Sequence, residues 1–223
     1  MKVVNKTVFV TFGWTEIPVI SSILRYGLNE GDRIVVILPE YRDERSQRAL
    51  NDLETFISNY VKNVEITKVY INLEDIADSI YKLKSCIENE KGRKGIVNLS
   101  GGMRSIVIIT YIATILAKHP DIMVELETED RKRIIEIPEI KPEDLRKFEE
   151  LSYLAKEIIK ELLFGPLEAA VLRKKLNAAA SSFHNAQMKL VEMGYIEREK
   201  KNKSSILKLT TRGKILAKLL IRG

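Results

Sequence analysis

The sequence predicts an α/β protein in which a mainly parallel sheet is followed by a smaller, largely helical domain with one hairpin. Two observations support this prediction. Up to about residue 140, short apolar strands alternate with amphipathic helices, the order that gives a parallel sheet with right-handed crossovers. Beyond the charged segment 138–142, which holds two prolines, the order changes to three helices, a hairpin and a final helix. We therefore expect two domains, residues 1–140 and residues 141–223.

The first domain is expected to be Rossmann-like. Its first strand is a continuous apolar run rich in β-branched residues, as expected of a strand that is buried on both faces, and three further strands are predicted after it. These strands are residues 7–13, 33–39, 64–71 and 95–100, with an edge hairpin of residues 123–130 and 133–138. The helix after the first strand is predicted to bury a stripe made of Ile17, Ile20, Ile23, Leu24 and Leu28.

The charge of the chain is unevenly divided. Residues 1–145 hold 20 Lys and Arg against 23 Asp and Glu, whereas residues 146–223 hold 17 against 8. The last third is therefore where a polyanion would bind, and an ordinary solvated basic face is the alternative. No stretch reaches the roughly 18–20 uncharged apolar residues of a membrane span. The single cysteine, Cys86, excludes an internal disulfide, and no Cys/His cluster occurs. We expect a cytoplasmic protein with no membrane partner, no metal and no cofactor.

The second domain is predicted to begin with one long helix, residues 142–165, and a short helix, residues 166–177. A third helix, residues 181–193, has four residues at the spacing of core-facing positions: Phe183, Ala186, Leu190 and Met193. This leaves short polar residues and a lysine on its outer side. The following run, LVEMGYIEREKKNKSSILKLTTRGKIL, resembles the end of the recognition helix, the wing and the next helix of winged helix-turn-helix regulators.

This resemblance implies a winged helix-turn-helix domain that binds double-stranded DNA. A helix fits the major groove, so short polar side chains at its start can reach base edges while lysines contact phosphates. The predicted DNA-binding residues are Ser181, Ser182, His184, Asn185, Lys189, Lys200, Lys201 and Lys203. A winged helix that contacts only protein is the alternative, and His184 could equally be a surface histidine without a role.

Two segments follow strands at positions where a ligand would bind. TFGWTE follows the first strand and NLSGGMRS the fourth, and ligands of open parallel sheets bind beyond the carboxyl ends of strands where the strand order reverses. Gly101 and Gly102 allow close backbone approach at the start of a helix whose dipole favours an anion. Ser100 offers a hydroxyl donor and Arg104 a positive charge. Tight packing of the helix start is the alternative explanation of the glycines. The patterns G-x-G-x-x-G and G-x-x-x-x-G-K-[ST] do not occur at these turns.

Together these turns resemble those of the CRISPR-associated Rossmann fold (CARF) family, which has a short polar or glycine-containing turn after strand one and an SGGMR-like turn after strand four. A CARF-like domain followed by a winged helix resembles the archaeal CARF transcription regulators of CRISPR loci. The resemblance implies binding of a cyclic oligoadenylate, with cyclic tetra-adenylate the favoured form, across the two-fold axis of a homodimer. The implied ligand-binding residues are Thr11, Phe12, Gly13, Trp14, Asn98, Leu99, Ser100, Gly101, Gly102, Met103 and Arg104. Trp14 is either a base-stacking residue or a packing residue.

The helix after the SGGMR turn, residues 104–116, is apolar nearly all round. It must be covered on several sides, either within one subunit or by a partner, and we expect a homodimer. Some CARF domains cleave their ring by placing a ribose 2′-OH in line with the phosphodiester, and Ser100 and Arg104 could serve that chemistry. No other catalytic set is evident, so we predict a non-enzymatic regulator. A ring nuclease that cleaves cyclic tetra-adenylate is the alternative.

Overall fold

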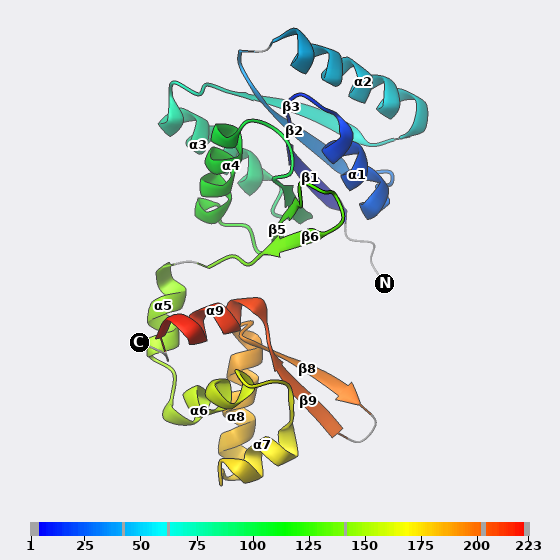
Figure 1. The fold of residues 1–223 in the computed structure, drawn as a ribbon. Helices are drawn as coiled ribbons and strands as arrows, with labels where there is room; N and C mark the ends of the chain where they lie inside the picture. The colour runs from blue at the N-terminus through cyan, green and yellow to red at the C-terminus, as the bar shows by residue number, and fades with distance from the viewer. Residues whose placement is uncertain (1–4, 42, 62, 141, 202–203, 221–223) are drawn as a thin grey trace. The chain divides into compact units, whose positions relative to one another are not determined.

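The structure is a computed structural model that describes residues 5–41, 43–61, 63–140, 142–201 and 204–220 (Figure 1). The chain divides into two compact units, Met1–Ile137 and Pro138–Gly223, and the predicted domain boundary at residue 140 lies just after this division. Within the described residues, no helix is long and apolar enough to cross a membrane.

The first unit is a six-stranded sheet in the order β3-β2-β1-β4-β5-β6. Neighbouring strands are parallel except β5 and β6, which form the predicted edge hairpin. The strands are β1 (Lys6–Thr11), β2 (Arg33–Pro39), β3 (Glu65–Ile71), β4 (Lys94–Asn98), β5 (Ile122–Glu127) and β6 (Ile134–Ile137). The helices are α1 (Ile17–Tyr26), α2 (Glu44–Tyr60), α3 (Ile76–Asn89) and α4 (Arg104–Leu116).

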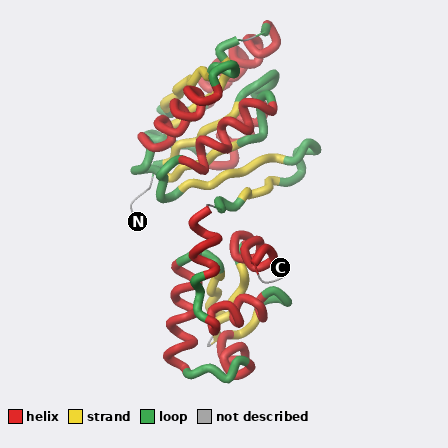
Figure 2. The backbone as a smooth tube through the Cα atoms, turned by 90° about the vertical axis from the view of Figure 1, so that its left-hand side faces the viewer, coloured by secondary structure: helices red, strands yellow, loops and turns green. Residues whose placement is uncertain are grey.

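Helices cover both faces of this sheet (Figure 2). Val8 and Val10 of β1 pack with α1 and α2, whereas Phe9 between them packs with α3 and α4. Alternate side chains of one strand thus enter two different cores, which explains why the strand is apolar throughout rather than at every second residue. The predicted Rossmann-like α/β class is confirmed.

The buried face of α1 differs from the predicted stripe. Pro18, Val19, Ser22 and Ile23 are buried, whereas Leu24 is 69% exposed. The prediction placed only apolar residues on the buried face, but Ser22 is buried because its hydroxyl accepts a hydrogen bond from a buried asparagine of β4. The helix is therefore rotated relative to the predicted stripe, and Leu24 points to solvent.

The second unit has the element order of a winged helix-turn-helix domain: helix, short strand, two helices and a hairpin. The second strand of the hairpin pairs with the short strand, which gives the sheet order β7-β9-β8. Its helices are α5 (Pro142–Glu149), α6 (Tyr153–Leu162), α7 (Ala169–Lys175), α8 (Ala180–Glu192) and α9 (Thr211–Leu220). Its strands are β7 (Leu167–Glu168), β8 (Ile196–Lys201) and β9 (Ser204–Leu209).

The prediction of one helix over residues 142–165 was wrong. Ser152 caps α6 by accepting a hydrogen bond from the backbone N–H of Ala155, at 3.3 Å, and this cap separates α5 from α6. The short α5 is fastened to the rest of the unit by an ion pair between Asp144 and Arg212 of α9. Phe148 of α5 is buried against Tyr195, with ring centroids 5.7 Å apart.

Candidate functional site

The turns after β1 and β4 meet at the carboxyl edge of the sheet, because these two strands are neighbours and the chain order of the strands reverses between them. Their backbones touch: a Cβ on Gly13 would lie 2.7 Å from the Cα of Gly102, and a Cβ on Gly101 would overlap the carbonyl oxygen of Thr11. Gly102 also has φ of +88°, in the left-handed region. The glycines therefore allow the two turns to pack on each other, which is the packing role that the sequence left open.

Two of the predicted ligand-binding residues lie beneath the turns rather than beside a cavity. Thr11 is fully buried and its hydroxyl donates to the carbonyl oxygen of Gly101 at 2.6 Å. Asn98 is also buried: its Oδ1 accepts from the backbone N–H of Ser100 at 2.8 Å. Its Nδ2 donates to Ser22 at 2.6 Å and to Glu125 at 3.0 Å. Both side chains hold the turns in place from below.

Glu125 is the centre of this buried network. Its carboxylate also accepts from Arg25 at 2.6 Å and from the hydroxyl of Tyr26, and the Glu125 side chain is only 3% exposed. Burial, followed by the hydrogen bond to Glu125, raises the pKa of Tyr26 well above its ordinary value, so this phenol stays protonated. One carboxylate thus ties α1 and β5 to the asparagine that positions the turn after β4.

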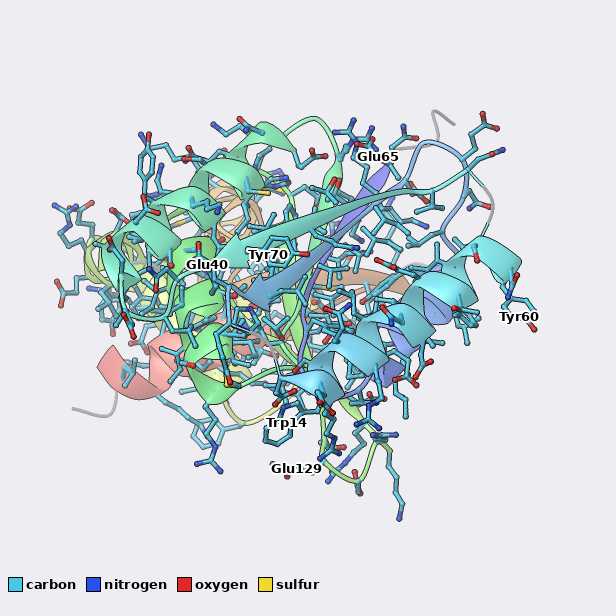
Figure 3. All side chains as sticks on the ribbon, turned by 90° about the horizontal axis from the view of Figure 1, so that it is seen from above. Trp14, Glu40, Tyr60, Glu65, Tyr70 and Glu129 are labelled. Carbon is cyan, nitrogen blue, oxygen red and sulfur yellow. The ribbon has the colours of Figure 1, made fainter. Side chains whose placement is uncertain are left out.

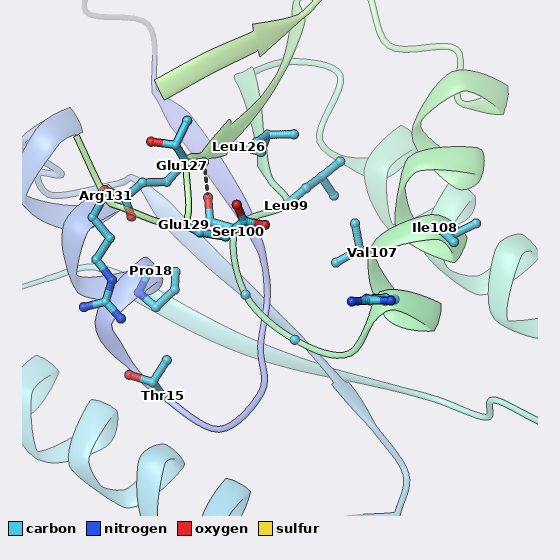
Figure 4. Close-up of a pocket in the computed structure, with 14 residues that line it drawn as sticks. Thr15, Pro18, Leu99, Ser100, Val107, Ile108, Leu126, Glu127, Glu129 and Arg131 are labelled. Carbon is cyan, nitrogen blue, oxygen red and sulfur yellow. Dashed lines mark hydrogen bonds between the residues drawn. The ribbon is translucent and has the colours of Figure 1, made fainter. Parts of the chain in front are cut away.

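A first cavity of about 530 Å³ opens beside the turn after β4 (Figure 4). It is lined by residues 99–102, the first turns of α4, Thr15 and Pro18, the last two residues of β5 (126 and 127) and residues 128, 129 and 131 after that strand. The Ser100 hydroxyl accepts from the backbone N–H of Glu127 at 2.8 Å, which leaves its own hydrogen free to donate.

Four charged side chains line the first cavity: Arg104, Glu127, Glu129 and Arg131. None of them forms an ion pair with another residue in the described part of the chain. Within the described part of the chain, no side chain accepts a hydrogen bond from the N-terminus of α4. The backbone N–H groups of its first turn are therefore available at the cavity. The cavity is therefore lined by two guanidinium groups, two carboxylates, a hydroxyl and a helix N-terminus.

A second cavity of about 520 Å³ lies on the other side of Gly102 and Arg104, which line both cavities. Of the predicted residues it also includes Phe12, Gly13, Trp14 and Met103. Its remaining wall comes from the loop after β2, with Tyr41 and Asp43, and from Ser46 and Ser105. Trp14, labelled in Figure 3, lies beside the start of α2 and its indole N–H donates to Asp43 at 2.9 Å.

One row of α4 remains uncovered. Ile108, Ile112 and Leu116, spaced four residues apart, are 58%, 37% and 53% exposed, and the row begins at Arg104. The opposite side of the helix, with Ile106 and Ile109, is buried in the sheet core. The first unit alone therefore does not cover α4 on all sides.

In the second unit, the five predicted residues of α8 are exposed, whereas Phe183, Ala186, Gln187 and Leu190 on the other side are buried. Lys200 is exposed on β8. Lys201 ends β8 but its side chain lies outside the described part of the chain, as does all of Lys203. Met193, predicted to face the core, is partly buried and packs against it.

Residues 6–138 match the model of a protein family described as the Csa3 CRISPR-associated Rossmann-like domain. The chain belongs to this family. The predicted membership of the CARF family is thus confirmed, and the first unit is its CARF domain. No curated protein matches the chain.

Several solved structures resemble about a third of the chain. Reduced HlyU from Vibrio cholerae shares 20% identity over 36% of this chain and 85% of its own, with a TM-score of 0.33. A ZitR variant from Lactococcus lactis shares 20% over 32% of this chain and 51% of its own, with a TM-score of 0.31. Transcriptional regulator Tm0710 from Thermotoga maritima shares 23% over 36% and 58%, with a TM-score of 0.31. The chain thus spans little more than half the length of ZitR and Tm0710. The winged-helix assignment rests on the element order of the second unit, not on these similarities.

Two groups of cavity-lining residues in the CARF domain were missed in the sequence. One lies at the end of β5 and in the loop after it, with Glu127, Glu129 and Arg131, and the other follows β2, with Tyr41 and Asp43. Both strands are next to β4 or β1 in the sheet, so their carboxyl ends reach the same edge. The strand order would have identified these residues. The loops after β2 and β5 reach the site because these strands are the outer neighbours of β1 and β4, between which the strand order reverses.

Proposed function

We propose that this chain is a homodimeric CRISPR-associated transcription regulator that binds a cyclic oligoadenylate, cyclic tetra-adenylate in the first instance, through its CARF domains and double-stranded DNA through its winged helix. The ring lies across the two-fold axis, with the SGGMR turn of each protomer facing it. Binding occurs without cleavage of the ring.

The observation that carries the ligand proposal is the composition of the first cavity. Arg104 and Arg131 have no carboxylate partner among the described residues, the Ser100 hydroxyl has a free hydrogen, and the N-terminus of α4 is uncapped. Guanidinium groups and helix N-termini are the groups that proteins use for phosphate. Each phosphodiester of a cyclic oligoadenylate carries one negative charge and accepts hydrogen bonds, so the donors of the site match it. Glu127 and Glu129 line the same cavity, so the match lies in these donors and not in a net positive charge of the lining.

The exposed row of α4 supports the homodimer. Ile108, Ile112 and Leu116 form an apolar strip on an otherwise buried helix, and such strips are characteristic of association surfaces. Ile108 also lines the first cavity, so a second copy packed on this row would border the ligand. A two-fold interface of this kind brings two ligand turns together.

The exposed side of α8 and the charge of the second unit support DNA binding. Ser181, Ser182 and Asn185 at the start of α8 are of the size and polarity that read base edges, and Lys189 and Lys200 are free to approach phosphates. The net positive charge of residues 146–223 adds an attraction that depends on salt but not on sequence.

Calorimetric titration of the full chain with cyclic tetra-adenylate tests the ligand proposal. We expect one ring per dimer and a Kd about 10- to 100-fold weaker in Arg104→Ala, because the variant loses a charge-assisted contact. Arg48→Ala removes the same charge from a side chain of α2 that lines neither cavity, and should leave the Kd unchanged. Chromatography of the ligand afterwards should recover the intact ring. A linearised ring would replace this proposal by ring cleavage, and absence of binding would refute it.

A further inference from the structure

The second cavity has a feature that phosphate binding does not use: two exposed aromatic side chains. Trp14 from the turn after β1 is 54% exposed, and Tyr41 from the loop after β2 is 83% exposed, and both line this cavity. Burial of a large aromatic side chain in a core would stabilise the fold. Aromatic side chains that are instead exposed at a cavity are therefore candidates for ligand contacts.

Trp14 is exposed but fixed in position. Its Nε1–H donates to Oδ2 of Asp43 at 2.9 Å, and Oδ1 of the same carboxylate accepts from the backbone N–H of Ser46 as the N-cap of α2. The guanidinium of Arg45 lies over the indole, 5.2 Å from the ring centroid. One edge and one face of the indole are therefore held by neighbours, while the residue as a whole stays 54% exposed at the cavity. A ring held in this way loses little conformational entropy when a ligand stacks on it.

The cavity is also continuous with the anion-binding groups. Gly102 and Arg104 line both cavities, so a phosphate held at Arg104 would be adjacent to each. A nucleotide places an aromatic base next to its phosphate, and the pair of cavities offers an aromatic surface next to a guanidinium.

We propose that the second cavity is a nucleobase site, in which a base of the ligand stacks on Trp14 and is covered by Tyr41. This inference rests on the proposed function, since it assigns the base of the same ligand whose phosphate is bound at Arg104. Stacking is tolerant of base identity because every base has a π face, so the site selects for an aromatic base and not for adenine alone.

Trp14 is the only tryptophan of the chain, so emission excited at a wavelength that tyrosine does not absorb reports on this cavity alone. We expect titration with cyclic tetra-adenylate to quench the emission with the same midpoint as the calorimetric binding curve. Inorganic pyrophosphate, which has the charge but no base, should leave the emission unchanged at concentrations that occupy Arg104. In Arg104→Ala, quenching should still occur, at a correspondingly higher ligand concentration.

Two substitutions test the stacking residues by calorimetry. Trp14→Leu and Tyr41→Leu should each weaken binding of the ring by at least about 10-fold, from the stacking contribution of one base. Tyr81→Leu removes a comparably exposed aromatic, 69% exposed on α3 and away from the cavity, and should have no effect. Thermal unfolding of all three variants, monitored by circular dichroism, should match the wild type within a few degrees.

The outcomes separate the base site from the ligand proposal. Calorimetric binding that depends on Arg104, without quenching and with unchanged affinity in both leucine variants, would overturn the base site and leave the ligand proposal intact. Absence of any binding of the ring would overturn both.

Discussion

Replacing Glu125 by glutamine tests whether the polar network beneath the turn after β4 stabilises the CARF domain as its geometry indicates. The carboxylate accepts from Arg25, Tyr26 and Asn98 and its side chain is 3% exposed. Glutamine preserves the shape, but it removes the charge and turns an amide N–H₂ toward one of the donors that now bond the carboxylate.

The magnitude follows from the number and kind of bonds that are lost. A hydrogen bond to a charged group contributes about 1.5–3 kcal/mol, and a buried donor left without a partner adds a similar penalty. Arg25 is 25% exposed and can regain water, which reduces its share of the loss. We therefore expect Glu125→Gln to lower the free energy of unfolding by about 2–3 kcal/mol.

Scanning calorimetry of the full chain measures this as a shift of the CARF transition. A loss of this size lowers the midpoint of a domain of this length by at least about 5 °C. Glu65→Gln is the matched control, because it makes the same chemical change at a carboxylate that is 58% exposed and paired with Arg33 at 2.7 Å. Such exposed pairs contribute about 0–1 kcal/mol. Equal midpoints for the two variants would refute the argument that burial makes the Glu125 network important.

Three further results are expected. Ile112→Glu places a charge in the open row of α4 and should convert the dimer to a monomer in analytical ultracentrifugation, whereas Leu24→Glu, also at an exposed apolar position, should not. Lys200→Ala should reduce the slope of log K against log salt for duplex DNA by about 0.9 if its ammonium contacts one phosphate, and Lys84→Ala in the CARF domain should leave the slope unchanged. Gly101→Ala introduces a Cβ that overlaps the turn after β1. It should lower the thermal midpoint of the CARF domain by several degrees and weaken binding of cyclic tetra-adenylate. An unchanged midpoint would contradict the close packing of the two turns.

The sheet of the CARF domain was predictable because its physical signal is strong. Strands buried on both faces must be apolar at every position, as Val8, Phe9 and Val10 illustrate, and few other structures require this over a short run. The edge hairpin was equally clear, because its strands are separated by a charged tip. These features depend on local composition alone.

Features that depend on tertiary partners were not predictable. Ser22 is buried and Leu24 exposed on α1 because Asn98 supplies a hydrogen bond to the serine, a contact between residues 76 positions apart. The break between α5 and α6 was missed because Ser152, which caps α6, lies in an otherwise helical pattern. In both cases a polar side chain with a specific partner determined the outcome, and apolar periodicity contains no information about such partners.

The site was predictable in position but only partly in membership. The motif identified the turns that contain Gly13 and Ser100, since both follow strands at the reversal of strand order. It could not distinguish Thr11 and Asn98, which support the turns from below, from residues that line a cavity. Tyr41 was missed because no motif in its own segment indicates a binding residue. It lines the second cavity because the loop after β2 lies beside Trp14.

The ion pair between Asp144 and Arg212 determines where this protein can be divided and recombined. Because α5 is joined to α9 by this pair and contributes the buried Phe148 to the same core, as does Leu151 in the turn after it, α5 is part of the winged-helix fold and not a spacer before it. A fragment that began at Tyr153 would lose two core side chains and leave the guanidinium of Arg212 without its carboxylate. Chimeras that graft this module onto a different sensor should therefore join the chains ahead of α5 and transplant that helix with the module.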